Sequence, residues 1–221
     1  MYRVERIEPN TTALIVVDMQ NDFVAPGAPM QSPAGHAMVP RLKRALACCR
    51  EYGISVVYTA PVHRPGGADL GLLAHDRRIA QGDALVAGSP GAAIFAELAP
   101  RDDEVVITKH RFSAFYGTDL EIVLRGLGVT TVVITGVTTE NCCHATARDA
   151  FFRDFRVVFL ADATATVDYP DLGYGGLSAD EVHRASLVIL ARDTADVVTT
   201  ETFVARVTAA SRVEPRLVAA G

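Results

Sequence analysis

The 221-residue sequence lacks the features that mark several large classes of protein. It has no basic excess, because 21 Lys and Arg stand against 26 Asp and Glu, and the charge of -5 argues against a nucleic-acid backbone as the main partner. No apolar run approaches the length of a membrane span, and the opening segment MYRVERIEPN contains no apolar signal core. We therefore expect a cytoplasmic protein that binds neither nucleic acid nor a membrane.

The four cysteines form two adjacent pairs, Cys48–Cys49 and Cys142–Cys143. Neighbouring cysteines bridge only with strain, so we expect reduced thiols rather than a disulfide framework. The sequence has no Cys-x-x-Cys spacing and no G-x-G-x-x-G pattern, which argues against a zinc or dithiol site and against dinucleotide binding. For the second pair, core packing, redox sensing and nucleophilic attack remain open.

What the sequence does contain is a series of short β-branched runs that alternate with helical patterns. Near-continuous Val/Ile runs are typical of strands buried on both faces of a parallel sheet. We predict a single α/β domain over residues 1–221, with one doubly wound open sheet of about six mostly parallel strands and helices on both faces. The expected strands are 12–18, 54–59, 104–108, 131–136, 156–161 and 195–200, and the expected helices are 38–52, 119–127, 140–155 and 178–192.

Reactive side chains follow three of the predicted strands. Asp18 follows the first strand, Lys109 the third and the Cys142–Cys143 pair the fourth, while His63 and Arg64 follow the second. The ligand crevice of an open parallel sheet lies beyond the carboxyl ends of its strands. We therefore expect a carboxylate, a cation and a thiol to meet there.

The segment GVTTENCC is predicted to pass from a strand through a tight turn into a helix, with Thr139 as N-cap. A helix N-terminus stabilises a thiolate, so we expect a lowered thiol pKa. Successive helical residues point about 100° apart, so both thiols cannot face one pocket. The apolar residues that follow place Cys143 on the packed face, which leaves Cys142 as the functional thiol.

Asp18 and Lys109 each have a functional and an ordinary interpretation. A partly desolvated Asp18 could take the thiol proton and return it, or it could simply cap a turn. Lys109 could hold that carboxylate ionised and favour thiolate, or it could be a surface lysine. Together with Cys142 they can attack an amide carbonyl, with backbone N–H groups of residues 138–142 as the oxyanion hole.

The irregular segments 61–88 and 167–178 are long enough to be functional or mobile. Tyr169 and Tyr174 of the second could line a substrate entrance or belong to a surface turn. We expect no metal and no cofactor, because the candidate ligands of the first segment show no recognisable ligand spacing. These candidates are His63, Asp69, His75 and Asp76.

Three segments resemble the isochorismatase-like cysteine hydrolases, and the resemblance covers roughly residues 11–198. They are ALIVVDMQNDFV, VITKHRFSAFYGTDLEIVLRGLGV and VVITGVTTENCCHATARDAFFRDFRVVFLADATAT. The resemblance implies a catalytic triad of Asp18, Lys109 and Cys142, with Cys142 as nucleophile and Asp18 as acid/base. It also implies a cis peptide between Val137 and Thr138, and an oxyanion hole made by the N–H groups of Thr138 and Cys142.

The residues of these motifs look most similar to those of the ureidoacrylate, biuret and carbamoylsarcosine amidohydrolases. Pro61 stands where metal-dependent nicotinamidases of this family carry an aspartate, and true isochorismatases lack the cysteine. The resemblance therefore implies a metal-independent amidohydrolase that cleaves a small amide, ureide or carbamoyl compound through a thioester and releases ammonia or an amine. The weaker substrate-contact candidates are Asn21, Phe23, Arg111, Phe115 and Tyr116.

Several alternatives remain at this point. The chain could be an isochorismatase-type or lactam-opening hydrolase, a non-catalytic binding homologue, or a redox sensor that uses Cys142–Cys143. The resemblance also implies a homo-oligomer, a dimer or tetramer, to whose packing the apolar segment 203–221 could contribute. The sequence does not identify the substrate.

Overall fold

Six strands form one sheet in the computed structural model, which describes residues 3–213. The strand order is β3-β2-β1-β4-β5-β6, and every pairing is parallel. The predicted doubly wound α/β architecture is confirmed, with a sheet that is wholly rather than mostly parallel. The strands are β1 Thr12–Val17, β2 Ser55–Pro61, β3 Val105–Lys109, β4 Thr131–Val137, β5 Arg156–Ala165 and β6 Asp196–Val198.

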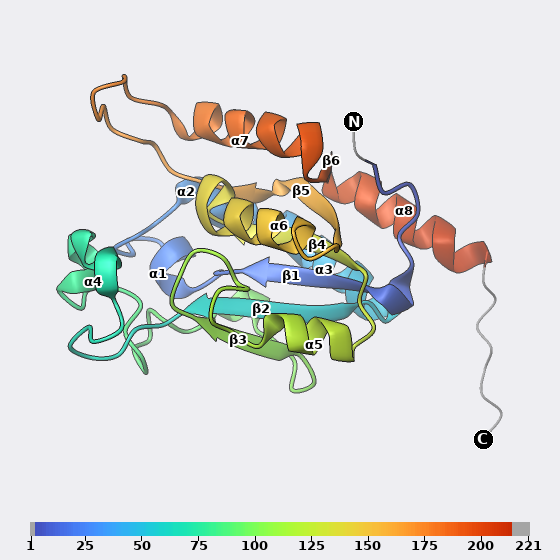
Figure 1. Ribbon diagram of the computed structural model, residues 1–221, viewed down its shortest axis with the longest axis horizontal. Coiled ribbons are helices and arrows are strands. Elements are labelled where there is room, and N and C mark those ends of the chain that lie inside the picture. Colours follow the sequence, from blue (N-terminus) through green and yellow to red (C-terminus); the bar gives the residue numbers. More distant parts are fainter. Residues whose placement is uncertain (1–2, 214–221) are drawn as a thin grey trace.

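The central strand β1 contributes alternate side chains to two cores, because successive residues of a strand point to opposite faces. Leu14 and Val16 belong to one core, and Ile15 and Val17 to the other. Figure 1 shows α5 and α6 in front of the sheet and α3 behind it. The helices are α3 Val39–Tyr52 and α8 Thr200–Val213 at the first core, and α5 Leu120–Gly126, α6 His144–Phe151 and α7 Ala179–Asp193 at the second.

All six strands run in the same direction, so their carboxyl ends open at one edge of the sheet, on the left in Figure 1. Short helices and loops gather at that edge, and the segment before α7 projects beyond it (Figure 1). The expected irregular segment 61–88 contains two short helical elements, whereas the segment 167–178 contains none. The short elements are α1 Asn21–Val24, α2 Pro33–Ala37, η2 Gly71–His75, α4 Arg77–Ala80 and η3 Ala96–Leu98, with η1 Pro9–Thr11 before β1.

The predicted helix 140–155 is divided into two elements. A wide turn, η4 Thr139–Cys143, comes first, and α6 follows it. The Cys143 N–H donates to the Thr138 carbonyl at 3.1 Å, a bond that spans five residues rather than four. The helix ends before Phe155, which turns back into the core.

The helix α8 was not predicted from sequence. Its Phe203 and Val207 are fully buried in the chain's own core, against α3, so the expectation that this segment packs between subunits is wrong for that face. Residues 214–221 of the same expectation lie outside the described residues. Within residues 3–213, no helix is both long and apolar enough to cross a bilayer.

Candidate active site

Asp18, Lys109 and Cys142 are in contact at the carboxyl edge of the sheet. The Lys109 Nζ lies 2.8 Å from Asp18 Oδ2 and 3.4 Å from Cys142 Sγ. Asp18 follows β1, Lys109 ends β3 and Cys142 lies in η4, so three separate elements contribute. All three residues are buried, with 0%, 1% and 9% of their surface exposed, respectively.

The backbone at the end of β1 turns the Asp18 side chain into the site. Asp18 has a φ of 55°, a left-handed conformation that aspartate tolerates better than most residues. Its N–H donates to the Thr59 carbonyl, and the Thr59 hydroxyl donates to Asp18 Oδ1 at 2.6 Å. The turn-capping interpretation of Asp18 is therefore wrong, because Thr59 and Lys109 engage its two carboxylate oxygens.

A glycine at the end of β4 brings the cysteine turn close to Asp18. Gly136 has a φ of 108°, and a Cβ there would lie 2.0 Å from the Val17 carbonyl oxygen. Only glycine accommodates such an approach between β1 and β4. The Val137–Thr138 peptide that follows is cis, as the family resemblance implied.

Lys109 is held by main-chain oxygens as well as by Asp18. Its Nζ donates to the carbonyls of Arg111 at 3.0 Å and Phe112 at 3.1 Å. With 1% of its side chain exposed, it is not a surface lysine, so that alternative is wrong. The ammonium is thus oriented between a carboxylate and a thiol.

The pKa values of the three groups are set by burial and by one another. Burial raises the pKa of the Asp18 carboxyl, and the Lys109 ammonium partly opposes this. Burial alone would lower the pKa of Lys109, but the charges of Asp18 and Cys142 outweigh it and the pKa is raised. Burial also raises the pKa of the Cys142 thiol, with Lys109 opposing, so the expected lowering at a helix N-terminus is wrong. Together, these pKa shifts favour a protonated Cys142 thiol beside a Lys109–Asp18 ion pair.

A cavity of about 660 Å³ opens beside the thiol. Of the residues expected to form the oxyanion hole, Thr138 and Cys142 both line it. Of the weaker substrate-contact candidates, Phe23 and Arg111 line it, as does His63.

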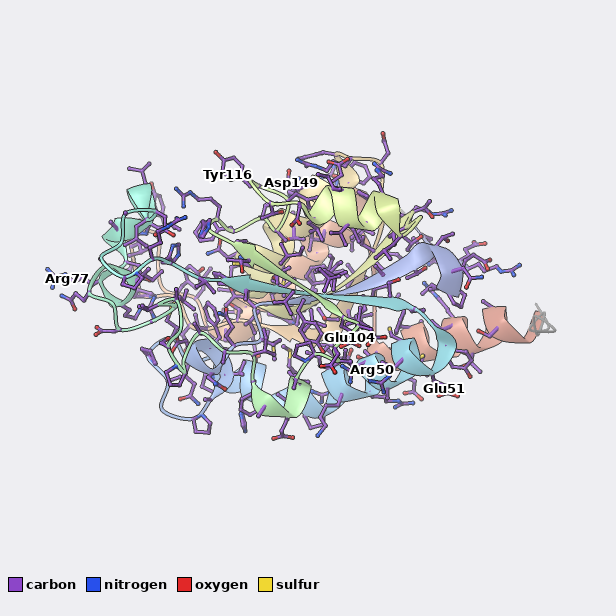
Figure 2. All side chains as sticks on the ribbon, turned by 90° about the horizontal axis from the view of Figure 1, so that it is seen from below. Arg50, Glu51, Arg77, Glu104, Tyr116 and Asp149 are labelled. Carbon is purple, nitrogen blue, oxygen red and sulfur yellow. The ribbon has the colours of Figure 1, made fainter. Side chains whose placement is uncertain are left out.

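The other three substrate-contact candidates lie outside the cavity lining. The Asn21 amide donates instead to the Pro90 carbonyl at 2.7 Å. Phe115 is buried in the core with its ring centroid 6.0 Å from that of Phe155. Tyr116 is 66% exposed at the surface (Figure 2).

Some cavity residues were not found from sequence. Glu140 lines the cavity, and its Oε1 accepts hydrogen bonds from the hydroxyls of Tyr169 and Thr138, each at 2.8 Å. Tyr169, one of two tyrosines considered for a substrate entrance, lines the cavity, whereas Tyr174 is 99% exposed. Glu140 could have been considered because it lies two residues before the favoured cysteine.

Among residues 3–213, one group of side chains could hold a metal ion. The ligand atoms of His63, Asp69 and His110 all lie within 4.8 Å of one another and form a nitrogen and oxygen donor set. His63 and Asp69 were among the candidate ligands predicted from sequence, whereas His110 was not. The other two candidates interact elsewhere, His75 with the Leu72 carbonyl and Asp76 with Arg78.

The chain is similar to known proteins over most of its length. The chain matches the family model described as isochorismatase domain over residues 12–202. A probable inactive nicotinamidase of Arabidopsis thaliana is 35% identical over 180 residues, 80% of this chain and 86% of that protein. The ureidoacrylate amidohydrolase RutB of Methylobacterium radiotolerans is 35% identical over 176 residues, 72% of this chain and 68% of that protein.

Among solved structures, a cysteine hydrolase from Pseudomonas syringae pv. phaseolicola superposes with a TM-score of 0.89 and 34% identity. The superposition covers 93% of this chain and 96% of the other. Sequence and structure thus agree over most of the chain, and the protein belongs to the isochorismatase family of hydrolases.

Proposed function

We propose that this protein is a cysteine amidohydrolase that cleaves a C–N bond of a small amide, ureide or carbamoyl compound. The observation that carries the proposal is the contact of Lys109 with both Asp18 and Cys142, beside a cavity large enough for a small molecule. A nucleophile, a proton acceptor and a fixed positive charge are the parts that acyl transfer requires. The relatives named an amidohydrolase and a cysteine hydrolase support the same chemistry.

In the proposed first half-reaction, the Cys142 sulfur attacks the carbonyl carbon while its proton passes to Asp18. The N–H groups of Thr138 and Cys142 stabilise the oxyanion. Collapse of the tetrahedral intermediate breaks the C–N bond, and Asp18 gives its proton to the departing nitrogen. Ammonia or an amine leaves, and the acyl group remains on Cys142 as a thioester.

In the second half-reaction, water attacks the thioester carbonyl and gives a proton to Asp18. The intermediate collapses to a carboxylic acid, and the Cys142 sulfur regains its proton from Asp18. Lys109 keeps its charge throughout, because its pKa is raised. It stabilises negative charge on Asp18 before proton transfer and negative charge that develops on the sulfur when the second intermediate collapses.

The two thiols face different partners, which argues against a redox pair. The Cys142 thiol contacts Lys109, whereas the Cys143 thiol lies 3.7 Å from the Thr135 carbonyl in the core. The non-catalytic alternative is favoured only by the relative described as inactive. The intact contact among Asp18, Lys109 and Cys142 argues against it.

The test is ammonia release from a panel of ureides, carbamoyl amino acids and aromatic amides. We expect at least one substrate class to be cleaved by the wild type, by Cys143→Ala and after chelator treatment, but not by Cys142→Ala. Activity that survives in Cys142→Ala and vanishes in Cys143→Ala would exchange the roles of the thiols. Loss to a chelator that zinc reverses would assign a catalytic metal to His63, Asp69 and His110. Turnover of a vinyl ether or a lactam, with no amide cleaved, would favour the alternative hydrolases.

We also propose that the protein forms a homo-oligomer. The helix α7 exposes Val188 and Ile189 at 66% and 50%. Apolar side chains gathered on one exposed helix are typical of a protein interface. Light scattering during size-exclusion chromatography would measure the mass, and a single-chain mass of 23.6 kDa at all concentrations would contradict the proposal.

A further inference from the structure

Arg111 is a half-buried arginine with no carboxylate partner among residues 3–213. Three other half-buried arginines each contact a carboxylate: Arg50 contacts Glu104 at 2.7 Å (Figure 2), Arg153 contacts Glu121 at 3.0 Å and Arg206 contacts Asp196 at 2.5 Å. Arg148, which is also half-buried, shares the lack of a carboxylate partner in that part of the chain but lies on α6 outside the cavity lining. Of these five half-buried arginines, Arg111 is therefore the one that both lines the cavity and lacks a carboxylate partner in the described part of the chain.

The Arg111 guanidinium is fixed in place. Its Nη1 donates to the carbonyls of His110 at 2.5 Å and Asp69 at 3.1 Å. Its other N–H groups bond to no protein atom in the described part of the chain. An anchored guanidinium with free donors can bind a carboxylate through two parallel hydrogen bonds without losing much conformational freedom.

The fixed guanidinium is also connected to the candidate catalytic residues. The Arg111 carbonyl accepts a hydrogen bond from Lys109 Nζ at 3.0 Å, so the same residue lines the cavity and holds the lysine with its backbone. A ligand group bound to the guanidinium would thus be held at a fixed position relative to the reacting centre. Substrate-positioning contacts act in this way.

The two other lysine and arginine side chains of the cavity wall already have carboxylate partners. Lys109 pairs with Asp18, and Arg78 pairs with Asp76. Among the acidic groups, Glu140 accepts two hydroxyl hydrogen bonds at Oε1 while its buried Oε2 has no hydrogen-bond partner among residues 3–213, and Asp168 accepts the N–H of Ala179 at 2.7 Å. A half-buried charge without a counter-charge is costly, so Arg111 is the cation of the wall whose carboxylate partner an incoming ligand would supply.

We propose that Arg111 binds a carboxylate of the substrate. The substrate is then an amide or ureide of a carboxylic acid, such as a half-amide of a dicarboxylic acid or a carbamoyl amino acid. This assignment rests on the proposed amidohydrolase function and narrows its substrate class. Neutral amides of the same size lack the group that Arg111 binds.

Matched acids and esters test this assignment in turnover. The substrates are succinamate with its methyl ester and N-carbamoylglycine with its ethyl ester. In the wild type we expect a lower KM for each acid than for its ester. In Arg111→Gln we expect the KM for the acids to rise about 10- to 100-fold with little change in kcat, and the KM for the esters to stay the same. Arg111→Lys should reverse part of the KM rise for the acids, because lysine keeps the positive charge but lacks the two parallel N–H donors of the guanidinium.

The control is Arg148→Gln, which removes a half-buried arginine outside the cavity and should leave all four KM values unchanged. A KM rise in Arg111→Gln that is equal for acids and esters would overturn the assignment, because it would show a structural role. Equal KM values for acid and ester in the wild type would overturn it too.

Binding without turnover separates this proposal from the proposed function. Calorimetry would compare succinate and dimethyl succinate on Cys142→Ala and on the same variant carrying Arg111→Gln. We expect succinate to bind Cys142→Ala and to lose about tenfold or more in affinity when Arg111 is replaced. Equal or undetectable binding of both compounds to both proteins refutes the carboxylate site even if amides are cleaved. Arg111-dependent succinate binding supports it even if the panel of amides shows no cleavage, an outcome that would instead refute the amidohydrolase.

Discussion

The two cysteine pairs share a dipeptide and similar burial but have opposite surroundings. Cys48 and Cys49 lie within α3 and pack into the apolar core, where burial raises the pKa of Cys48 to about 11. Neither thiol has a side-chain hydrogen bond or ion pair among residues 3–213. Cys142, although also buried, lies 3.4 Å from the Lys109 ammonium.

The difference between the pairs follows from their place in the fold. The first pair lies in the last turns of a helix that covers the sheet, whereas Cys142 follows the carboxyl end of β4. At that edge, loops from other strands bring charged groups together. Position relative to the sheet, rather than the dipeptide or its burial, thus gives one thiol a chemical environment that the other three lack.

Cysteine-to-serine changes test the comparison most strongly. Serine is close in size to cysteine, but its hydroxyl is a far weaker nucleophile, so Cys142→Ser should lose about 10⁴-fold or more in kcat/KM. Cys48→Ser should change kcat/KM by less than about twofold, because its thiol contacts only the core. Ammonia release gives the rates, and circular dichroism confirms folding. Substantial activity in Cys142→Ser would remove the distinction between the pairs.

Asp18→Asn should have the next largest effect. The amide keeps the size of the side chain and can still bond Thr59, but it accepts no thiol proton, so we expect kcat/KM to fall about 10³-fold. The matched control is Asp149→Asn, because Asp149 pairs with Arg153 outside the cavity (Figure 2). If Asp18→Asn kept wild-type rates, Cys142 would obtain its reactivity without the carboxylate that distinguishes it from Cys48.

The reactive residues could be predicted because each lies at or shortly after the carboxyl end of a strand. Val-rich runs locate the strands, parallel topology brings their carboxyl ends to one edge, and Asp18, Lys109 and Cys142 must then be neighbours. Helical geometry further separates the directions of Cys142 and Cys143. These inferences need only the order of elements, which a single chain supplies.

The surrounding residues could not be predicted, because side-chain direction in loops depends on local backbone angles and on partners distant in sequence. Asn21 turns to the Pro90 carbonyl and Phe115 turns into the core, although both stand near triad residues in the sequence. Tyr169 meets Glu140 across 29 positions. The sign of the Cys142 pKa shift was also missed, since burial, which raises this pKa, outweighs the opposing effect of the Lys109 ammonium.

The pH dependence should show the coupling that the first pair lacks. Only ionised Asp18 can accept the thiol proton, so kcat/KM should fall about tenfold per pH unit as the pH drops below the Asp18 pKa. Burial raises that pKa above 3.8, so the fall should begin at a higher pH than for an ordinary aspartate. The pKa of Lys109 is raised above 10.5, so its deprotonation should produce no loss below that pH.

The pH profile is checked with kcat/KM for one substrate between about pH 3 and 10, while circular dichroism follows folding at each pH. Cys48→Ser should give the same profile as the wild type, because its thiol is uncoupled from Asp18. An acid limb at or below 3.8, with the protein folded, would show that Lys109 rather than burial dominates the pKa of Asp18.

The smallest effects should come from the inner thiol of each pair. Cys143→Val and Cys49→Val replace fully buried thiols by a slightly larger apolar group, so each should change the free energy of unfolding by less than about 1.5 kcal/mol. Both variants should keep kcat/KM within about twofold, as urea titration and ammonia release would measure. Since Cys143 adjoins Cys142 in the chain, an activity loss of tenfold in Cys143→Val alone, at unchanged stability, would mean that the inner thiol helps to position the outer one. Equal, small effects would show instead that Cys143 resembles Cys49 more closely than it resembles its own neighbour.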